Sequence, residues 1–466
     1  MKILPLIAAV ALPLWLASCA TPPAAPALAE TAPPQWYAPL PHQGALSDLT
    51  QWWQQFNDPL LVQLIEAAQT ASPNVASARA RIEQARATRT AAGAALLPTL
   101  DAQASLARGN TQPPAPLATT LQAGLQAGWE IDLFGGNAAA LRAAQSRLEA
   151  AQAGWHDARV SVAAETASSY VNLRSCERQR AVTDNDAGSR AETARLADLT
   201  AKAGFTAPAT AALARASAAE ASARSKQQAA QCELELKVLV ALSTIPEPQL
   251  REKLQAPWQE PAEAPLLPVL SLPAQLLAQR PDVYQAERDV AAASFDVGNA
   301  QAQRYPRLTL NGSIAAGLVR TGGETVSAQT WSIGPVALSL PLFDGGRRAA
   351  NVDAARARYD EAVALYTARV RQAVREVEQA LVTLESARQR MEDARIASEG
   401  YRASFVATEA RYRSGLGSLV ELEDARRTLL AAETALVALQ RERVAAWIAL
   451  YRAVGGGWAR PPAPSA

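Results

Sequence analysis

The sequence predicts a mixed α+β membrane protein in which pairs of β-strands alternate with long helical hairpins. Two regions alternate apolar and polar residues with the two-residue period of half-exposed strands. Each region leads through a pair of glycines into a long, alanine-rich segment without an internal proline. Because this order of features occurs twice, we expect two internal structural repeats.

The composition is typical of thin helix-on-helix packing. Of the 466 residues, 49% are apolar but only 5% are aromatic, so alanine supplies much of the apolar content. The 45 basic and 44 acidic residues nearly cancel, which argues against nucleic acid as a partner. The two histidines, His42 and His156, lie far apart and lack companion ligands, so we expect no metal site. No nucleophile elbow or phosphate loop is present in the sequence, and we predict neither an enzyme nor a bound cofactor.

Residues 1–18 are typical of a secretion signal, because Lys2 precedes an apolar run too short to span a membrane. The Leu-Ala-Ser-Cys pattern at the end of this run resembles a bacterial lipoprotein cleavage motif. That resemblance implies that Cys19 becomes the first mature residue and carries a lipid, and the alanine after it implies delivery to the outer membrane. The alternative is a plain signal peptide with an unrelated cysteine. Residues 19–45, rich in proline and alanine, would tether the fold to the membrane.

The first repeat is predicted at residues 46–245 and the second at 274–458. Each contains one amphipathic helix between two prolines, in "SPNVASARARIEQA" and "RPDVYQAERDVAAA". The alternating patterns then predict strand pairs at 99–134 and 307–343. A proline-rich linker at 246–273, expected in an equatorial region, joins the repeats, and residues 459–466 form a C-terminal tail.

Each repeat closes with a long helical hairpin, predicted at 137–242 and 347–454. In the second hairpin apolar residues recur with a mean spacing of about 3.5, the coiled-coil value. Turn sequences around Gly204 and Gly415 divide each hairpin into two antiparallel helices. Helices of this length build coiled coils, spans or tubes, and not the cores of compact domains.

Paired glycines mark the passage from strand to helix in both repeats. Glycine permits the tight bend and the close backbone approach that such a junction requires. The Leu-Phe pair before each junction is expected near the inner boundary of the membrane. The junction residues are Gly135, Gly136, Gly345 and Gly346.

Cys176 and Cys232 lie at equal sequence distances from Gly204, each about 28 residues, or roughly 42 Å, along its helix. On antiparallel helices the two cysteines therefore face each other, and an oxidising compartment predicts a disulfide between them. The alternative is a pair of buried free thiols, because a Cα separation above about 7 Å forbids the bond.

The four predicted strands, of about 10 to 16 residues, are long enough to cross a bilayer at a tilt. Four strands cannot close a barrel, and an open sheet edge in lipid leaves backbone groups unpaired at a cost of several kcal/mol each. A membrane barrel therefore requires several chains.

Several motifs, in order along the chain, resemble the outer-membrane efflux family, the TolC-like channels, in its lipoprotein branch. They are "WWQQFNDPLLVQLIEAA", "RPDVYQAERDVAAA", "GNAQAQRYPRLTL" and "YRAVGGGW". The resemblance implies a homotrimer whose twelve-stranded transmembrane β-barrel continues into a twelve-helix periplasmic α-barrel. It also implies a lipid-anchored exit duct in the outer membrane. Such a duct passively conducts small organic solutes or drugs from a periplasmic adaptor and an inner-membrane, RND-type pump.

Two alternative functions remain open at this point. The duct of a type I protein secretion system has the same kind of tunnel, and the tunnel sequence does not distinguish the two. A purely structural, lipid-anchored coiled-coil protein of the periplasm is the alternative from another class, although the alternating strand pairs argue against it.

In this family the periplasmic tip of the tunnel is the gate, and the matching stretch here is "YRSGLGSLVELEDARR", which begins at Tyr412. On a helix, Val420, Glu421, Asp424 and Arg427 share one face. Trimer symmetry would make Val420 an apolar constriction and the two acids carboxylate rings that attract cations and pair with nearby arginines. The same stretch matches a capping box, which gives Glu421 a competing structural role, so Asp424 is the favoured pore residue.

Overall fold

A computed structural model describes residues 36–38, 49–110, 117–258 and 279–460. The expected signal peptide, Cys19, most of the tether, and parts of the linker and tail lie outside these ranges. The described residues form two compact units, and each unit takes segments from both predicted repeats. Unit 1 contains Arg79–Ala153 and Tyr284–Ala368, whereas unit 2 contains the described parts of Glu30–Ala78, Gly154–Val283 and Arg369–Ala466.

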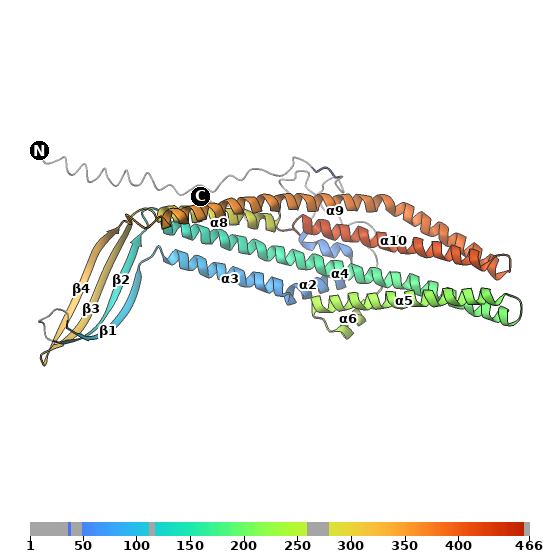
Figure 1. The fold of residues 1–466 in the computed structure, drawn as a ribbon, viewed down its shortest axis with the longest axis horizontal. Coiled ribbons are helices and arrows are strands. Elements are labelled where there is room, and N and C mark those ends of the chain that lie inside the picture. Colours follow the sequence, from blue (N-terminus) through green and yellow to red (C-terminus); the bar gives the residue numbers. More distant parts are fainter. Residues whose placement is uncertain (1–35, 39–48, 111–116, 259–278, 461–466) are drawn as a thin grey trace. The chain divides into compact units, whose positions relative to one another are not determined.

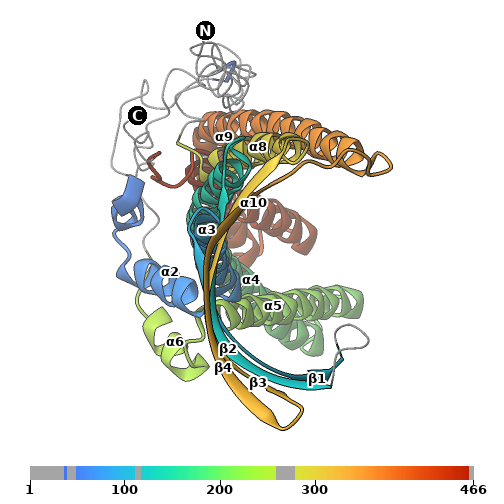
Figure 2. The ribbon, with the colours of Figure 1, turned by 90° about the vertical axis from the view of Figure 1, so that its left-hand side faces the viewer.

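Unit 1 is built on one antiparallel sheet with the strand order β1-β2-β3-β4 (Figure 1). The strands are β1 Thr99–Gly109, β2 Ala118–Ile131, β3 Arg307–Thr321 and β4 Glu324–Ser339, within the two predicted segments. Strands β2 and β3 belong to different predicted repeats and pair directly, so the two strand pairs form a single sheet. Figure 2 shows that this sheet is curved.

On strands β1 to β3 the sheet has one apolar and one polar face, as the alternating sequence pattern predicts. On β4 the register places Thr325 and Ser327 on the apolar side and Val326 on the polar side. On one face the register aligns Leu106 with Leu121 and Leu121 with Leu318. On the other face Gln103 donates a hydrogen bond through Nε2 to Gln126 Oε1 at 2.9 Å, and the Ser313 and Ser332 hydroxyls lie 2.9 Å apart. Large apolar side chains on the first face are exposed to solvent, which is the arrangement of a sheet that contacts lipid on one side.

Four helices join the sheet at one end of its strands (Figure 1). Helix α3 (Pro73–Ala94) precedes β1 and α8 (Pro281–Ala302) precedes β3, while β2 and β4 lead into α4 (Gly136–Lys202) and α9 (Arg347–Arg413). An ion pair between Arg147 and Asp296 links α4 to α8. No helix in the described ranges combines the length and the apolar character needed to cross a membrane.

Unit 2 contains the two helical hairpins and a small group of short helices. Helix α5 (Pro208–Ser243) follows α4, and α10 (Leu419–Ala453) follows α9. The short elements are the 3-10 helix η2 (Leu49–Phe56), α2 (Pro59–Ala71) and α6 (Glu247–Leu254). Their apolar residues pack with those of α4, α5, α9 and α10 in one core cluster.

Several aromatic rings contact one another in this core. Trp52 is fully buried and stacks on Tyr451 with ring centroids 4.8 Å apart, and Trp53 meets the same tyrosine edge-on at 4.6 Å. Tyr170 is also fully buried, and its hydroxyl donates to Asp58, whose carboxylate caps α2 by accepting from Leu60 N at 3.0 Å. Burial, together with the hydrogen bond to Asp58, raises the pKa of Tyr170.

Two expectations from the sequence, for the linker and for the tether, are wrong in part. The predicted linker begins with a packed helix, because α6 buries Leu250 completely in the unit 2 core. Within the predicted tether, Trp36 is buried and Tyr37 N and Ala38 N donate to the Glu378 carboxylate at 2.7 and 2.9 Å, so this part is docked. By contrast, the helix predicted between two prolines before β1 is present as α3. A separate helix, α2, ends just before it at Ser72, because a residue before proline disfavours the helical conformation.

Candidate functional site

The ends of the two hairpins have the same backbone geometry. Gly204 and Gly415 follow α4 and α9 with φ of 81° and 76°, the left-handed conformation that ends many helices. The next residues, Phe205 and Leu416, donate their N–H groups back to Thr200 O at 2.9 Å and Arg411 O at 2.8 Å. Their side chains are 83% and 73% exposed, so each turn presents one apolar side chain to solvent.

The predicted pore residues lie on the exposed side of α10, directly after the second turn. Val420 is 67% exposed, and Glu421, Asp424 and Arg427 are exposed as well. Asp424 accepts a hydrogen bond from Arg427 of the same helix, so its arginine partner belongs to this chain. These residues thus share a face, and Leu419 and Leu422 point to the other, buried side.

Glu421 is committed to the capping box at the start of α10. Its Oε2 accepts from Ser418 N at 2.9 Å, and Ser418 Oγ accepts from Glu421 N at 3.2 Å. The box satisfies two backbone donors that the helix itself leaves free. Asp424 is therefore the better placed of the two carboxylates to act in a pore.

Tyr412 is half-buried and packs against a small apolar cluster at the tip. The cluster joins both hairpins, since Ala194 and Ala197 come from α4, Ala211 and Ala214 from α5, and Leu419 and Leu422 from α10. The alanines on α4 and α5 let the backbones of these two helices approach closely, and Tyr412 packs against the cluster from α9. It supports the tip and does not stand free on the exposed face.

A buried network of charged and hydroxyl groups lies next to this cluster and connects the two hairpins. Glu423 of α10 accepts from Arg426 Nη1 at 2.9 Å, from Ser217 Oγ of α5 at 2.6 Å, and from Arg190 of α4. Arg190 Nε also donates to Asp186 Oδ1 at 2.9 Å. One carboxylate thus holds side chains from three helices.

Arg426 is the most deeply buried member of the network, with a side chain that is 3% exposed. Its Nη2 donates to Thr193 Oγ1 at 2.7 Å and to Ser189 Oγ at 2.9 Å, both on α4. The guanidinium lies 5.7 Å from the centre of the Phe405 ring and 3.8 Å from a carboxylate oxygen of Glu409, both on α9. Together, Arg426 and Glu423 contact all four hairpin helices.

The spacing of two arginines in the sequence is a signal for this network. Arg426 follows Leu419 and Leu422 at positions i+7 and i+4, which is the apolar seam of the helix. Arg190 precedes Ala194 and Ala197 with the same spacing on α4. An arginine at a seam position on each hairpin predicts buried polar partners, because a buried charge must be paired.

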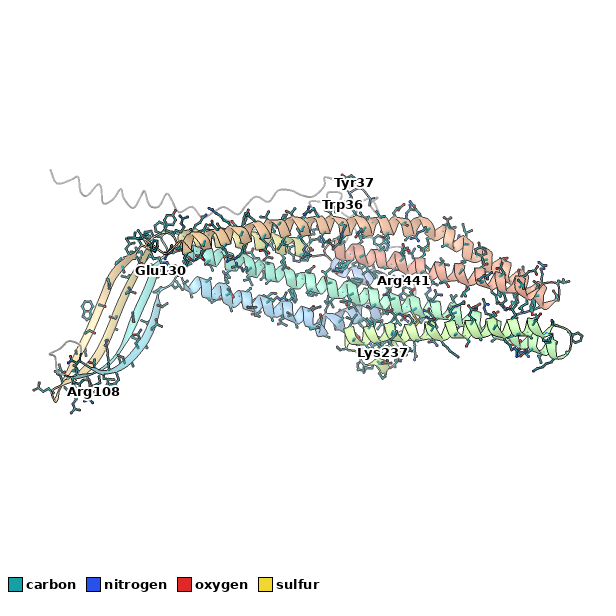
Figure 3. The ribbon with its side chains drawn as sticks, in the orientation of Figure 1. Trp36, Tyr37, Arg108, Glu130, Lys237 and Arg441 are labelled. Atoms are coloured by element: carbon teal, nitrogen blue, oxygen red, sulfur yellow. A yellow bond between two sulfur atoms is a disulfide. The ribbon has the colours of Figure 1, made fainter. Side chains whose placement is uncertain are left out.

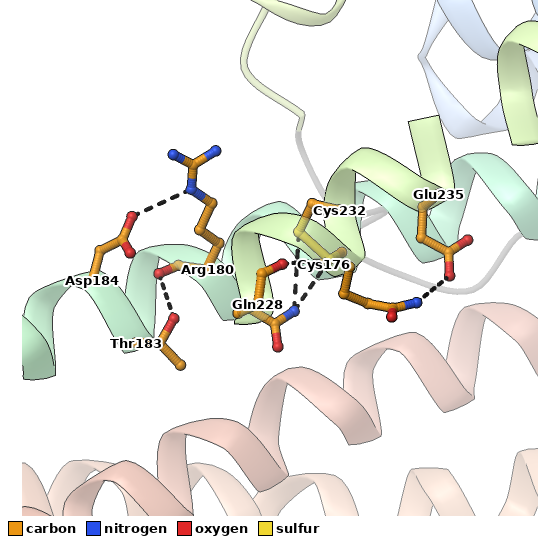
Figure 4. The surroundings of a disulfide bond; sticks show 8 residues. Cys176, Arg180, Thr183, Asp184, Gln228, Cys232 and Glu235 are labelled. Atoms are coloured by element: carbon orange, nitrogen blue, oxygen red, sulfur yellow. Dashed lines mark hydrogen bonds and ion pairs between the residues drawn. A yellow bond between two sulfur atoms is a disulfide. The ribbon is translucent and has the colours of Figure 1, made fainter. Parts of the chain in front are cut away.

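Cys176 of α4 and Cys232 of α5 form a disulfide in the structure, with a Cα–Cα distance of 5.5 Å (Figure 4). Both residues are buried in the unit 2 core. Gln228 lies beside the bond, and its Nε2 donates to Cys176 Sγ at 3.1 Å. The bond joins the two helices of the first hairpin only, whereas the second hairpin contains no cysteine.

The first strand-to-helix junction combines a glycine pair with an aspartate cap. Gly135 has φ of 71°, and a Cβ on Gly136 would lie 3.2 Å from Ala302 Cβ of α8, so the second glycine serves close packing. Asp132, before the glycines, accepts from Asn137 N at 3.2 Å and from Ala138 N at 2.7 Å. The carboxylate therefore satisfies the first free amides of α4.

The second junction uses the same chemistry in a different order. Gly345 and Gly346 have φ of 64° and 88°, and Asp344 accepts from Gly346 N at 3.0 Å and Arg348 N at 3.2 Å. Phe343 is 93% exposed, whereas Phe134 of the first junction stacks on Tyr305 with centroids 4.8 Å apart. The two junctions thus share a glycine with positive φ and an aspartate cap, but the phenylalanine is stacked on a tyrosine in the first junction and exposed in the second.

A further charged cluster holds the end of α10 in unit 2. Arg280 is buried and donates to Asp282 through Nε and Nη2, at 2.9 and 2.8 Å, to Glu376 at 2.9 Å and to Ala453 O at 2.8 Å. Burial opposes the ionised form of Asp282, but the Arg280 hydrogen bonds and charge outweigh it and lower the pKa of Asp282. Nearby, burial and then the Asp282 charge raise the pKa of Asp157, and the surrounding arginines only partly oppose this.

This chain belongs to the outer membrane efflux protein family, whose sequence profile matches residues 64–242 and 272–456. The resemblance inferred from the motifs is therefore confirmed. The chain is 30% identical to the pyoverdine export outer membrane protein OpmQ of Pseudomonas aeruginosa, over 98% of this chain and 97% of the relative. It is 29% identical to nodulation protein T of Rhizobium leguminosarum bv. viciae, over 98% and 95%. The solved outer-membrane channel OprN aligns with a TM-score of 0.80 and 28% identity, over 94% of this chain and 100% of that chain.

Proposed function

We propose that this protein is the outer-membrane exit duct of a tripartite efflux pump and that it works as a homotrimer. The main observation behind this proposal is the sheet. It has an apolar face on β1 to β3 and, among the described residues, two outer strands that are paired on one side only. Such edges cannot remain open in lipid, so β4 of one copy pairs with β1 of the next. Three copies then close a barrel of twelve strands.

The hairpins provide the periplasmic tunnel, and Cys19 provides a lipid anchor. The docked segment Trp36–Ala38 supports this arrangement, because it fixes the chain that leads from the anchor against α9. At the tip, Val420 and Asp424 face the pore, and the buried network around Glu423 and Arg426 holds the two hairpins of one chain together. Opening of the gate requires this network to rearrange or to move as a unit.

The hairpin turns provide the contact surface for a periplasmic adaptor, which connects the duct to an inner-membrane pump. Phe205 and Leu416 support this proposal, since exposed apolar side chains on a protein surface mark interaction sites. The cargo is a small organic solute. OpmQ is named for pyoverdine export, and the sequence has only two methionines, which argues against the methionine-rich chemistry of soft metal export.

Single-channel recording in planar bilayers tests the duct and the pore residue together. We expect the wild-type protein to form cation-preferring channels and Asp424→Ala to weaken that preference. Glu192→Ala is a matched control, because Glu192 is an exposed carboxylate of α4 with an arginine partner three residues away. Inserted wild-type protein without channels would refute the duct and favour a structural coiled-coil protein, and an unchanged Asp424→Ala channel would refute only the carboxylate ring.

A deletion strain separates efflux from protein secretion. Loss of an efflux duct raises the accumulation of a small fluorescent dye in cells, and the wild-type gene restores the original level. Unchanged dye accumulation together with loss of a secreted protein would instead identify a type I secretion duct.

A further inference from the structure

Two arginines lie on the apolar face of the sheet, at the end of the strands opposite the helices. Figure 3 shows Arg108 at this end. The backbone register aligns Arg108 with Thr119 and aligns Thr119 with Arg320, so both arginines belong to one row across β1, β2 and β3. The next row on the same face, one step toward the helices, consists of Leu106, Leu121 and Leu318 on these three strands and continues with Ser327 on β4. The face therefore changes from apolar to cationic within one row.

Neither arginine has an acidic partner on this face. Both side chains are exposed, and within the described ranges neither guanidinium makes a hydrogen bond or an ion pair. Glu324 begins β4 nearby, but it aligns with Thr321 and so points to the opposite face of the sheet. The connection from β1 to β2, residues 110–117, contains no acidic residue in its sequence. The pair is thus a local positive charge directly beyond an apolar surface.

The height of the apolar face matches that of a membrane barrel. Along β3 the face runs from Leu308 to Leu318, a distance of ten residue steps, which is about 34 Å at 3.4 Å per step. At a tilt of about 45° this length spans roughly 24 Å of membrane, close to the apolar band of about 25 Å in known barrels. The row of Arg108 and Arg320 therefore falls at the level of the lipid headgroups on the far side.

Two arginines at this spacing suit a phosphate. They are separated by one intervening strand, so their backbones lie about 10 Å apart, and two long side chains can converge on one group from both sides. Arginine binds phosphate through paired N–H donors in a planar fork, which makes it better suited than a point charge to hold an oxyanion.

We propose that Arg108 and Arg320 bind the phosphate of an anionic lipid in the leaflet that faces away from the helices. The inference rests on the proposed function, because only a sheet embedded in the outer membrane brings this row to a headgroup layer. The occupant is a phosphate-bearing glycolipid of the lipid A type, whose acyl chains cover the leucine rows below while its phosphate meets the guanidinium groups. Bound lipid then fixes the height of the duct in the membrane.

Native mass spectrometry of the purified full-length protein in detergent tests the site. The probes are lipid A with both phosphates, the same lipid A after enzymatic removal of its phosphates, and inorganic phosphate alone. We expect the double variant Arg108→Gln/Arg320→Gln to bind phosphorylated lipid A about 25-fold more weakly, about fivefold for each arginine. Arg307→Gln is the matched control, because Arg307 lies on the same strand but on the polar face, and its lipid binding should be unchanged.

Three results would overturn the proposal: equal binding of lipid A to the double variant and the wild type, equal binding of dephosphorylated lipid A, or displacement of lipid A by millimolar inorganic phosphate. Bilayer recordings of the same preparations keep the two proposals apart. If wild-type protein binds lipid A through the arginines but forms no channels, the proposed duct function is refuted and the lipid site is supported. If channels form but the arginine substitutions do not affect lipid binding, the duct function is supported and the lipid site is refuted.

Discussion

Glu423 connects three helices at the hairpin tip, so its neutralisation should loosen the tip selectively. Its carboxylate accepts from Arg190, from Ser217 Oγ at 2.6 Å and from Arg426 Nη1 at 2.9 Å. The side chains of Glu423 and Arg426 are 18% and 3% exposed, so the pair is largely shielded from water. Glu423→Gln keeps the size of the side chain and removes its charge.

The size of the effect follows from what Arg426 would retain. Removing one partner of a buried ion pair costs about 3–5 kcal/mol, because the remaining charge loses its compensation. Arg426 would keep its hydrogen bonds to Ser189 and Thr193, so the lower end, about 3 kcal/mol, applies. Since each 1.4 kcal/mol is a factor of ten, local opening should become about a hundredfold more frequent.

Hydrogen exchange measured by mass spectrometry is the suitable assay, because it resolves the tip from the rest of the chain. Peptides around residues 186–193 and 419–427 should exchange about a hundredfold faster in Glu423→Gln, while peptides from the aromatic core stay protected. Asp424→Asn is the control, since its ion pair with Arg427 is exposed on both sides, and it should change exchange less than fivefold. Equal effects of the two substitutions would contradict the conclusion that the buried network around Glu423 holds the hairpins together.

Three further outcomes are expected. Replacing Cys176 and Cys232 by serine should lower the free energy of unfolding by about 4 kcal/mol, because the disulfide closes a long loop in the unfolded chain. If neither the substitutions nor a reductant changed the melting temperature, the protein would not contain this disulfide. Asp157→Asn should raise the melting temperature at neutral pH. The pKa of Asp157 is raised in the folded protein, so the folded state loses stability as the pH rises above the ordinary value of 3.8 and through the raised value, and asparagine removes this loss. A gain in melting temperature that persists below pH 3.8 would show another cause. Gly455→Ala should destabilise more than Gly415→Ala, since both glycines have positive φ but only the first would place a Cβ 2.3 Å from a backbone oxygen; equal unfolding curves would refute this packing argument.

Much of the local structure could be predicted from the sequence because it depends on local periods. Period-two alternation located the strands, long proline-free segments located the hairpins, and Gly204 and Gly415 located the turns. The capping box at Ser418 and Glu421 is also local, because its two partners lie within one turn of helix. The position of the disulfide followed from equal distances to a turn, which is a property of any antiparallel hairpin.

Other features could not be predicted because they depend on contacts between distant segments. The expected tether at Trp36–Ala38 is docked through Glu378, about 340 residues away, and only the packed structure brings the two together. The motif that begins at Tyr412 predicts a gate residue there. In the structure its side chain is half-buried and packs against a cluster that includes residues of the other hairpin.

By itself, the sequence determined the elements, their order, their repetition and the amphipathic character of the strands, since each depends on residues close together in the chain. Only the tertiary structure decided which polar side chains meet. Arg426 and Arg190 find shared partners because the hairpins of different repeats pack along their seams. Arg108 and Arg320 form one row because β2 and β3 pair in a particular register, and a shift of one residue would have sent one of them to the polar face.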